Sequence, residues 1–159
     1  MTKISWQVGA MTPTDLPAVY QIELQSPSPW NLRQLTEELA HPDGLQLVCC
    51  LKGGDTVSGF LMARLQTTEV EILKIATARE FQRQGTASIL LQTLIALADL
   101  RGIQHIHLEL RSENLPARTL YEKNGFEVTG QRSNYYTGPK DNALCMTLSL
   151  PRREYPQQP

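Results

Sequence analysis

The sequence has no long apolar run and no large excess of charge of either sign. Its apolar stretches are much shorter than the ~20 residues that a membrane-spanning helix needs, so no membrane span is expected. Residues 1–6 are too polar for a signal peptide. Fifteen basic and sixteen acidic residues leave a net charge of −1. This balance argues against a broad nucleic-acid-binding surface, so direct binding of nucleic acid is not expected.

Cysteine and histidine are also scarce, with three of each. No cluster of these residues has the spacing of metal ligands, so no metal is expected. Cys49, Cys50 and Cys145 are odd in number and lie in apolar, strand-like stretches. We therefore expect three reduced, buried thiols, which indicate a cytoplasmic protein.

The sequence does have enough apolar residues for a packed core. It contains 159 residues, of which 41% are hydrophobic and 19% are charged. This composition excludes a disordered chain, and the length fits one domain. We expect this domain to span residues 1–150 and residues 151–159 to form a disordered tail.

Alternating and helical patterns of apolar residues predict a mixed α/β fold. Helices are expected over about 14–25 and 32–40, over a long segment after 82–88 that closes at 101–102, and over 114–124. Strands are expected near 3–10, 45–52, 56–66, 69–78, 103–111, 126–132 and 142–150. The expected order is β-α-α-β-β-β-α-β-α-β-β.

Residues 82–88 (QRQGTAS) join a strand to the longest helix and have the features of an anion site. The first backbone N–H groups of a helix lack an internal partner, and the helix dipole adds positive potential there. Gly85 and Ala87 are small enough for phosphate oxygens to approach the backbone, and Arg83 adds positive charge. An ordinary helix start would look similar, and the segment matches neither G-x-x-x-x-G-K-[ST] nor G-x-G-x-x-G.

Motifs in the second half of the chain make it resemble a known family. The pattern Q-x-x-G-x-A at 82–87, together with LYEKNGF at 120–126, closely resembles the GNAT superfamily of acetyl-CoA-dependent N-acetyltransferases. Over residues 1–150 the chain more specifically resembles the RimI-type ribosomal-protein-alanine N-acetyltransferases. The pieces that carry this second likeness are SPWN at 28–31, EILKIA at 71–76, LELR at 108–111, NYY at 134–136 and DNALCM at 141–146.

The resemblance implies a GNAT-like acyl-CoA N-acyltransferase fold, in which two central strands splay apart and acetyl-CoA lies between them. It implies Asn114 as a contact near the pantetheine arm. The implied backbone contacts are Ile75, Ala76 and Thr77 at the acetyl and pantetheine end, and Arg83, Gln84, Gly85, Thr86, Ala87 and Ser88 at the pyrophosphate.

The resemblance also implies the reaction and its catalytic residues. Glu109 is the implied general base and Tyr121 the implied general acid, with Trp30 and Tyr135 beside a groove for a peptide. The implied acceptor is the α-amino group of an N-terminal alanine in a small-subunit ribosomal protein. An α-amino group has a pKa of about 7.7–8.0, so modest help from a carboxylate is enough to deprotonate it. Direct transfer in a ternary complex requires no metal.

Each assignment has an alternative that the residues alone leave open. Glu109 could be a solvated carboxylate on a strand, Tyr121 a core aromatic and Asn114 only a helix cap. Trp30 could be a packing lid rather than a substrate contact. His107, two residues from Glu109 on the same strand face, is a second candidate proton acceptor.

Lys74 departs from the pattern of the family, which often has a small polar residue there. Its position is close to where the acceptor amine is expected, so its charge could repel a cationic acceptor. Two other functions therefore stay open. One is a GNAT enzyme that acetylates a small amine, a polyamine or an aminoglycoside, and the other is a non-catalytic acyl-CoA-binding module.

Overall fold

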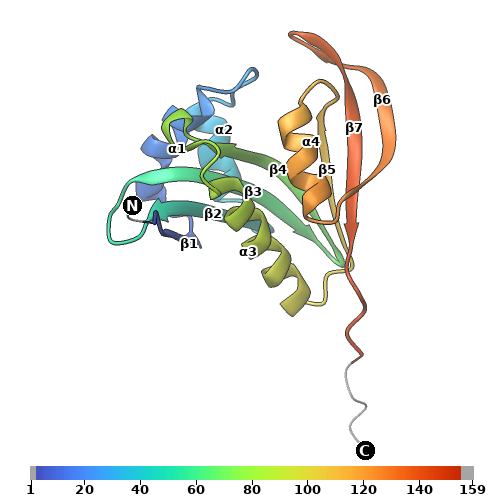
Figure 1. Cartoon of the computed structure of the whole chain (residues 1–159), viewed down its shortest axis with the longest axis horizontal. Helices are drawn as coiled ribbons and strands as arrows, with labels where there is room; N and C mark the ends of the chain where they lie inside the picture. Colours follow the sequence, from blue (N-terminus) through green and yellow to red (C-terminus); the bar gives the residue numbers. More distant parts are fainter. Residues whose placement is uncertain (1–2, 155–159) are drawn as a thin grey trace, which may run out of the picture.

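The computed structural model describes residues 3–154, in which one seven-stranded sheet is covered by four α-helices (Figure 1). The strand order is β1-β2-β3-β4-β5-β7-β6. The elements are β1 (Trp6–Ala10), α1 (Leu16–Glu23), α2 (Leu32–Leu39), β2 (Gly44–Leu51), β3 (Val57–Gln66), β4 (Glu69–Thr77), α3 (Thr86–Leu100), β5 (His105–Arg111), α4 (Leu115–Lys123), β6 (Glu127–Thr137) and β7 (Lys140–Ser149), with short 3-10 turns η1 (Pro13–Asp15) and η2 (Arg79–Phe81).

The predicted α/β fold and its order of elements are confirmed, with two notable shifts at strand ends. The first strand begins at Trp6 rather than residue 3. The sixth strand continues to Thr137 rather than 132, because its pairing with β7 shifts between Arg132 and Tyr136. This bulge interrupts the alternation of side chains that sequence patterns detect. Residues 151–154 have no regular structure, and the rest of the predicted tail, 155–159, lies outside the described residues.

Strand β3 separates two apolar layers on opposite faces of the sheet. Leu61 packs with the leucines of α3, whereas Phe60 and Met62 pack with residues of α1 and α2. Successive side chains of a strand point to opposite faces, so α3 covers one face and α1 with α2 covers the other. Tyr121 of α4 belongs to the same cluster as α3. Helices α3 and α4 therefore share a face, as Figure 1 also shows.

The parallel strands β4 and β5 separate part-way along their length. They pair from Glu69 with His105 to Ile72 with Leu108, and no further. A bulge in β4 opposite β3, at Leu73, coincides with this point. The C-terminal half of β4 therefore has no strand partner on its β5 side, which confirms the splayed central strands expected from the resemblance.

The structure also bears on the expectations for the three cysteines and for a membrane span. Cys49 is buried, but Cys50 and Cys145 are only partly buried, so the expectation of three buried thiols is wrong for two of them. All three are free thiols. Among residues 3–154, none of the helices is long and apolar enough to cross a membrane. The assignment of residues 1–150 to one domain stays a prediction.

Candidate active site

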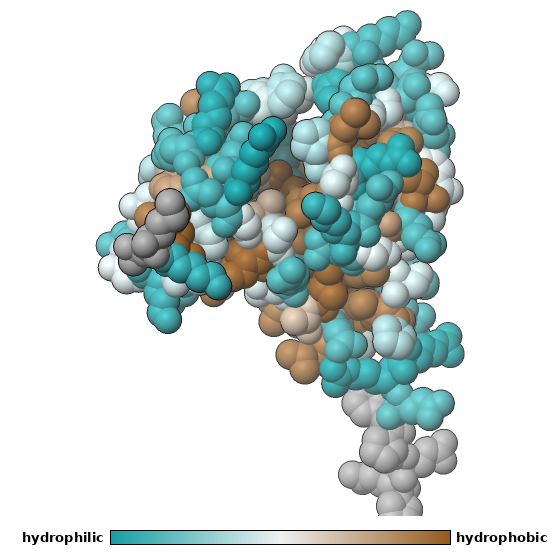
Figure 2. All heavy atoms as spheres, viewed as in Figure 1, coloured by the Kyte–Doolittle hydropathy of each residue, from teal (hydrophilic) through white to brown (hydrophobic). Residues whose placement is uncertain are grey.

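A cavity of about 590 Å³ opens where β4 and β5 separate. It lies between the N-terminus of α3 and helix α4, and Figure 2 shows the hollow with apolar surface inside it. Most of the predicted cofactor contacts line it: Ile75, Ala76, Thr77, Arg83, Gly85, Thr86, Ala87, Ser88 and Asn114. The structure thus brings together two segments of the chain and one residue from a third.

The N-terminus of α3 is open toward this cavity. Helices α2 and α4 are capped by the side chains of Asn31 and Asn114, which accept hydrogen bonds from backbone N–H groups. Helix α3 instead begins after Gly85, which has no side chain to cap it and adopts a φ of 90°. Its first N–H groups, together with the helix dipole, can therefore hold an anion.

Gln84 is the one residue of the predicted 83–88 contact set that does not line the cavity. Its backbone carbonyl accepts a hydrogen bond of 2.9 Å from the indole Nε1 of Trp6 on β1. In a trans peptide the C=O and the following N–H point in opposite directions. Trp6 therefore holds the peptide plane so that the N–H of Gly85 points away from β1. Phe81 supports the indole in an edge-to-face contact, with ring centroids 5.6 Å apart.

Gly59 of β3 permits a close approach beneath the α3 N-terminus. A Cβ at this position would lie 2.7 Å from the Ala76 carbonyl oxygen and 2.7 Å from Cγ2 of Thr86. Such distances are too short for real contacts, so only glycine fits without displacement. The Thr86 side chain is thereby held at the cavity, where its Oγ1 is buried and has no hydrogen-bond partner among the described residues.

Ser26, at the other side of the cavity, also has a buried Oγ without a partner in the part of the chain that the structure describes. Buried polar groups are normally hydrogen-bonded, and a buried group without a partner lowers the stability of the fold by about 1–3 kcal/mol. Two orphaned hydroxyls around one hollow therefore favour a polar ligand that completes their bonding.

Tyr121 and Asn114 both face the cavity, and each combines a structural role with that position. The Tyr121 ring is 4% exposed and packs against Phe126, with ring centroids 5.5 Å apart. Burial raises the pKa of the Tyr121 phenol, so the hydroxyl keeps its proton at neutral pH. The side-chain Oδ1 of Asn114 accepts a hydrogen bond of 3.2 Å from the backbone N–H of Ala117, so Asn114 is the cap of α4 as well as a cavity residue.

Glu109 lies on the opposite face of the sheet from Tyr121. Its strand neighbours Leu108 and Leu110 belong to the core cluster that contains Tyr121, so the Glu109 side chain points the other way. Its Oε1 pairs with Nε of Arg132 at 2.9 Å. Glu109 does not line the cavity, and the two predicted catalytic residues could reach a common substrate only through the opening between β4 and β5.

His107 is engaged elsewhere on the same strand face. Its Nδ1 lies 2.8 Å from the Thr147 hydroxyl, and its Nε2 lies 3.4 Å from a Glu69 carboxylate oxygen. These contacts favour a structural role. Among residues 3–154, no three His, Cys, Asp or Glu side chains come together as a metal site requires.

Trp30 and Tyr135, which were predicted to border a peptide groove, lie outside the cavity, and their role stays a prediction. Trp30 borders a second hollow of about 380 Å³ with Gln34, Glu37, Glu38, His41 and Arg64. Tyr135 is 50% exposed and packs edge-to-face on Tyr136.

Several residues at the cavity were not expected from the sequence. Gln25, Ser26 and Pro27 line it from the end of α1, and Pro116, Ala117 and Leu120 line it from α4. The serine and proline residues at 26–29 favour a loop, but nothing local indicates that this loop faces β4. The contact of Trp6 with Gln84 joins residues 78 positions apart, so local patterns could not reveal it.

Comparison with known proteins decides the family. The model of the acetyltransferase (GNAT) family matches residues 16–126 of this chain. The chain belongs to the GNAT family. This GNAT protein is therefore an acyltransferase of the N-acetyltransferase type, as the motifs predicted.

Relatives of this GNAT protein include ribosomal-protein-alanine N-acetyltransferases. The [ribosomal protein bS18]-alanine N-acetyltransferase of Salmonella typhimurium is 30% identical over 145 residues, which cover 91% of this chain and 96% of the relative. The crystal structure of the ribosomal-protein-S18-alanine N-acetyltransferase from Escherichia coli matches with a TM-score of 0.87 and 29% identity, covering 94% of this chain and 97% of that one. Ard1 from Thermoplasma volcanium matches with a TM-score of 0.83 and 25% identity, covering 92% and 99%. The likeness to RimI-type enzymes is thereby confirmed.

Proposed function

We propose that this GNAT enzyme transfers the acetyl group of acetyl-CoA to the N-terminal alanine of ribosomal protein bS18. The observation that carries the proposal is the 30% identity to an enzyme named for this reaction, over nearly the full length of both chains. A ribosomal protein as substrate implies that the reaction takes place in the cytoplasm.

The cavity fits acetyl-CoA in its donor groups and its position. The uncapped α3 N-terminus and Arg83 suit a pyrophosphate, because both favour negative charge. The unpaired edge of β4 at Ile75, Ala76 and Thr77 offers backbone groups to the amides of a pantetheine arm. The Thr86 and Ser26 hydroxyls offer further hydrogen bonds to a polar ligand.

The two faces of the sheet suggest separate approaches for donor and acceptor. Acetyl-CoA supplies an activated thioester from the side of α3 and α4. The amine then approaches from the face of Glu109, which accepts its proton directly or through a water. Tyr121, which retains its proton because of burial, donates it to the departing sulfur. Arg132 orients the Glu109 carboxylate by pairing with it.

Release of free thiol from acetyl-CoA tests the proposal. The acceptors are a basic peptide that begins with alanine, the same peptide with a blocked N-terminus and an internal lysine, spermidine and an aminoglycoside. We expect turnover only with the free alanine terminus. Equal turnover of the blocked peptide would refute N-terminal specificity. Turnover of spermidine or the aminoglycoside alone would establish a small-amine acetyltransferase instead.

A further inference from the structure

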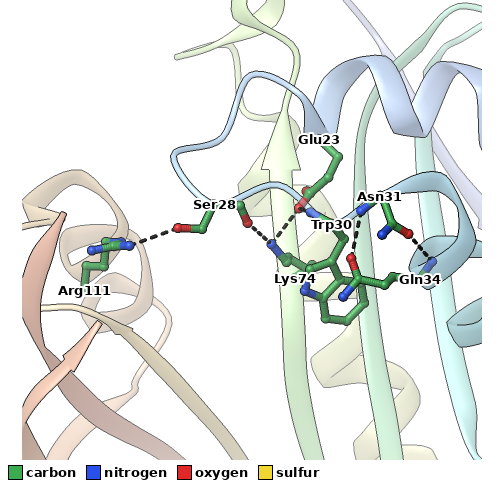
Figure 3. A network of polar contacts seen from close by, with 7 residues as sticks. All are labelled: Glu23, Ser28, Trp30, Asn31, Gln34, Lys74 and Arg111. Carbon is green, nitrogen blue, oxygen red and sulfur yellow. Dashed lines mark hydrogen bonds and ion pairs between the residues drawn. The ribbon is translucent and has the colours of Figure 1, made fainter. Parts of the chain in front are cut away.

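The segment 26–30 crosses the opening between β4 and β5 and is held from both strands at one residue, Ser28 (Figure 3). Its backbone carbonyl accepts a hydrogen bond of 3.1 Å from Nζ of Lys74 on β4. Its hydroxyl accepts one of 3.0 Å from Nη2 of Arg111 on β5. The two strands no longer pair with each other at this level. We call this arrangement of Lys74, Ser28 and Arg111 the Ser28 bridge.

The Lys74 end of the bridge is anchored by a buried carboxylate. Lys74 Nζ lies 2.5 Å from Oε1 of Glu23, whose side chain is 1% exposed. The same oxygen accepts the backbone N–H of Trp30 at 2.9 Å. Lys74 Nζ also lies 5.1 Å from the centroid of the Trp30 ring, within cation–π range. The charge of Lys74 is therefore balanced internally and does not stand free to repel an acceptor.

The Arg111 end of the bridge joins a second segment. Arg111 donates hydrogen bonds of 2.6 and 3.1 Å to the carbonyls of Pro139 and Gly138 in the turn between β6 and β7. Its guanidinium lies 4.3 Å from the centroid of the Tyr136 ring. Arg111 thus ties the β6–β7 turn to the segment 26–30 across the opening.

The bridged segment also contributes residues to both hollows described above. Ser26 and Pro27 line the cavity assigned to acetyl-CoA, whereas Trp30 lines the second hollow beside α2. A displacement of Ser28 would therefore change the wall of the acetyl-CoA cavity and the wall of the second hollow. The segment joins α1 to α2, the helices on the sheet face of Glu109, so it lies on the side from which the proposed acceptor approaches.

We infer that the Ser28 bridge positions the segment 26–30 as the acceptor-side boundary of the active site, so that Lys74, Ser28 and Arg111 determine acceptor binding. This inference rests on the proposed function. The three residues are positioning residues, because they act through Trp30 and the backbone of the segment. The inference requires that loosening the bridge weakens acceptor binding and leaves acetyl-CoA binding unchanged.

Steady-state kinetics of Ser28→Ala test the Arg111 end. This variant removes the hydroxyl and keeps the carbonyl that Lys74 contacts. We expect the KM for the alanine-starting peptide to rise about 5-fold, the effect of roughly one hydrogen bond, with kcat and the KM for acetyl-CoA within about 2-fold of wild type. Ser149→Ala is the matched control, since its hydroxyl contacts only His105, at 3.4 Å, among the described side chains. An unchanged or lower KM for the peptide would overturn the inference.

The Lys74 end needs a double variant, because Lys74→Met alone leaves the Glu23 carboxylate buried without its cation. Lys74→Met combined with Glu23→Gln removes both charges at similar volume. We expect it to raise the KM for the peptide at least as much as Ser28→Ala does. A parallel rise in the KM for acetyl-CoA would show a general disturbance and overturn the inference.

A readout independent of activity separates the bridge from the proposed reaction. The sequence has two tryptophans, so in a Trp6→Phe background Trp30 alone reports by fluorescence. We expect Ser28→Ala in this background to increase acrylamide quenching of Trp30. Unchanged quenching would refute the bridge whatever the acceptor is. If wild-type enzyme fails to acetylate the peptide while quenching changes as expected, the proposed acceptor is wrong and the bridge stands.

Discussion

At the scale of single residues, Tyr121 combines burial with a hydroxyl that is free to act. The ring is held in the core by Phe126, yet the residue lines the cavity. Because Tyr121 lines the cavity, its hydroxyl proton is available to a ligand bound there. A free tyrosine loses its proton at a pKa of about 10, and burial raises that pKa further. A general acid must carry its proton at the working pH, and Tyr121 meets this requirement.

Replacing Tyr121 with phenylalanine removes the proton donor and keeps the packed ring. We expect Tyr121→Phe to lower kcat by about 100-fold or more, the usual contribution of general acid catalysis, with little change in the KM for acetyl-CoA. Initial rates of thiol release measure both. Tyr20→Phe on α1 is the matched control and should leave kcat unchanged. A kcat within about 3-fold of wild type in Tyr121→Phe would mean that another group protonates the leaving sulfur.

The sequence could predict those site residues that are neighbours along the chain. Gly85 to Ser88 follow one another at the start of a helix, so their common exposure to a ligand is a local property. Gln84 turns away because of Trp6, which is distant in sequence. The ion pair of Glu109 with Arg132 depends on the register of β5, β7 and β6, which no local pattern specifies.

At the scale of secondary-structure elements, strand β1 controls the loop that precedes α3. The loop contains two residues with positive φ, Arg83 at 61° and Gly85 at 90°. A non-glycine residue such as Arg83 is strained in this region and keeps this conformation only where the surrounding structure holds it. The indole of Trp6 holds the intervening carbonyl of Gln84. The edge strand thus organises the loop proposed to bind phosphate, although Trp6 itself does not line the cavity.

We expect Trp6→Phe to raise the KM for acetyl-CoA about 5-fold, because the ring contact with Phe81 persists while the hydrogen bond to Gln84 is lost. The kcat and the KM for the peptide should stay within about 2-fold of wild type. The control is Val8→Ala on the same strand, which loosens packing but keeps the indole. If Val8→Ala raises the KM for acetyl-CoA equally, the effect comes from β1 packing rather than from the hydrogen bond.

The bounds of an element could be predicted where the spacing of its apolar residues stays regular. The prediction was wrong where that spacing is interrupted. Helix α2 matches its prediction closely, because Asn31 caps it and accepts the N–H of Gln34 at 2.8 Å. Strand β6 was predicted too short, since Asn134 adopts a φ of 53° within its bulge. The extra residue in β4 at Leu73 was equally invisible, although it lies where β4 and β5 begin to separate.

At the scale of the whole molecule, the sheet has a weak seam between β4 and β5. Four residue pairs join these strands, compared with eight between β3 and β4 and seven between β5 and β7. Figure 1 shows β5, β6, β7 and α4 on one side of this seam and the remaining elements on the other. Beyond the four pairs, the cavity separates the two sides. The cavity is lined by residues of β4 and α3 on one side and of α4 on the other, so a ligand in it would contact both sides.

A ligand that spans this seam should stabilise both sides together. At a concentration 100 times its Kd, binding adds about 2.7 kcal/mol to the free energy of unfolding. We expect saturating CoA to slow hydrogen exchange in residues 74–77, in the first turn of α3 and in α4. The hairpin of β2 and β3 near residues 49–58 contributes no residue to the cavity lining. It is the internal control and should exchange at an unchanged rate. Protection confined to the first turn of α3 would mean that CoA binds by its phosphates alone and does not bridge β4 and α4.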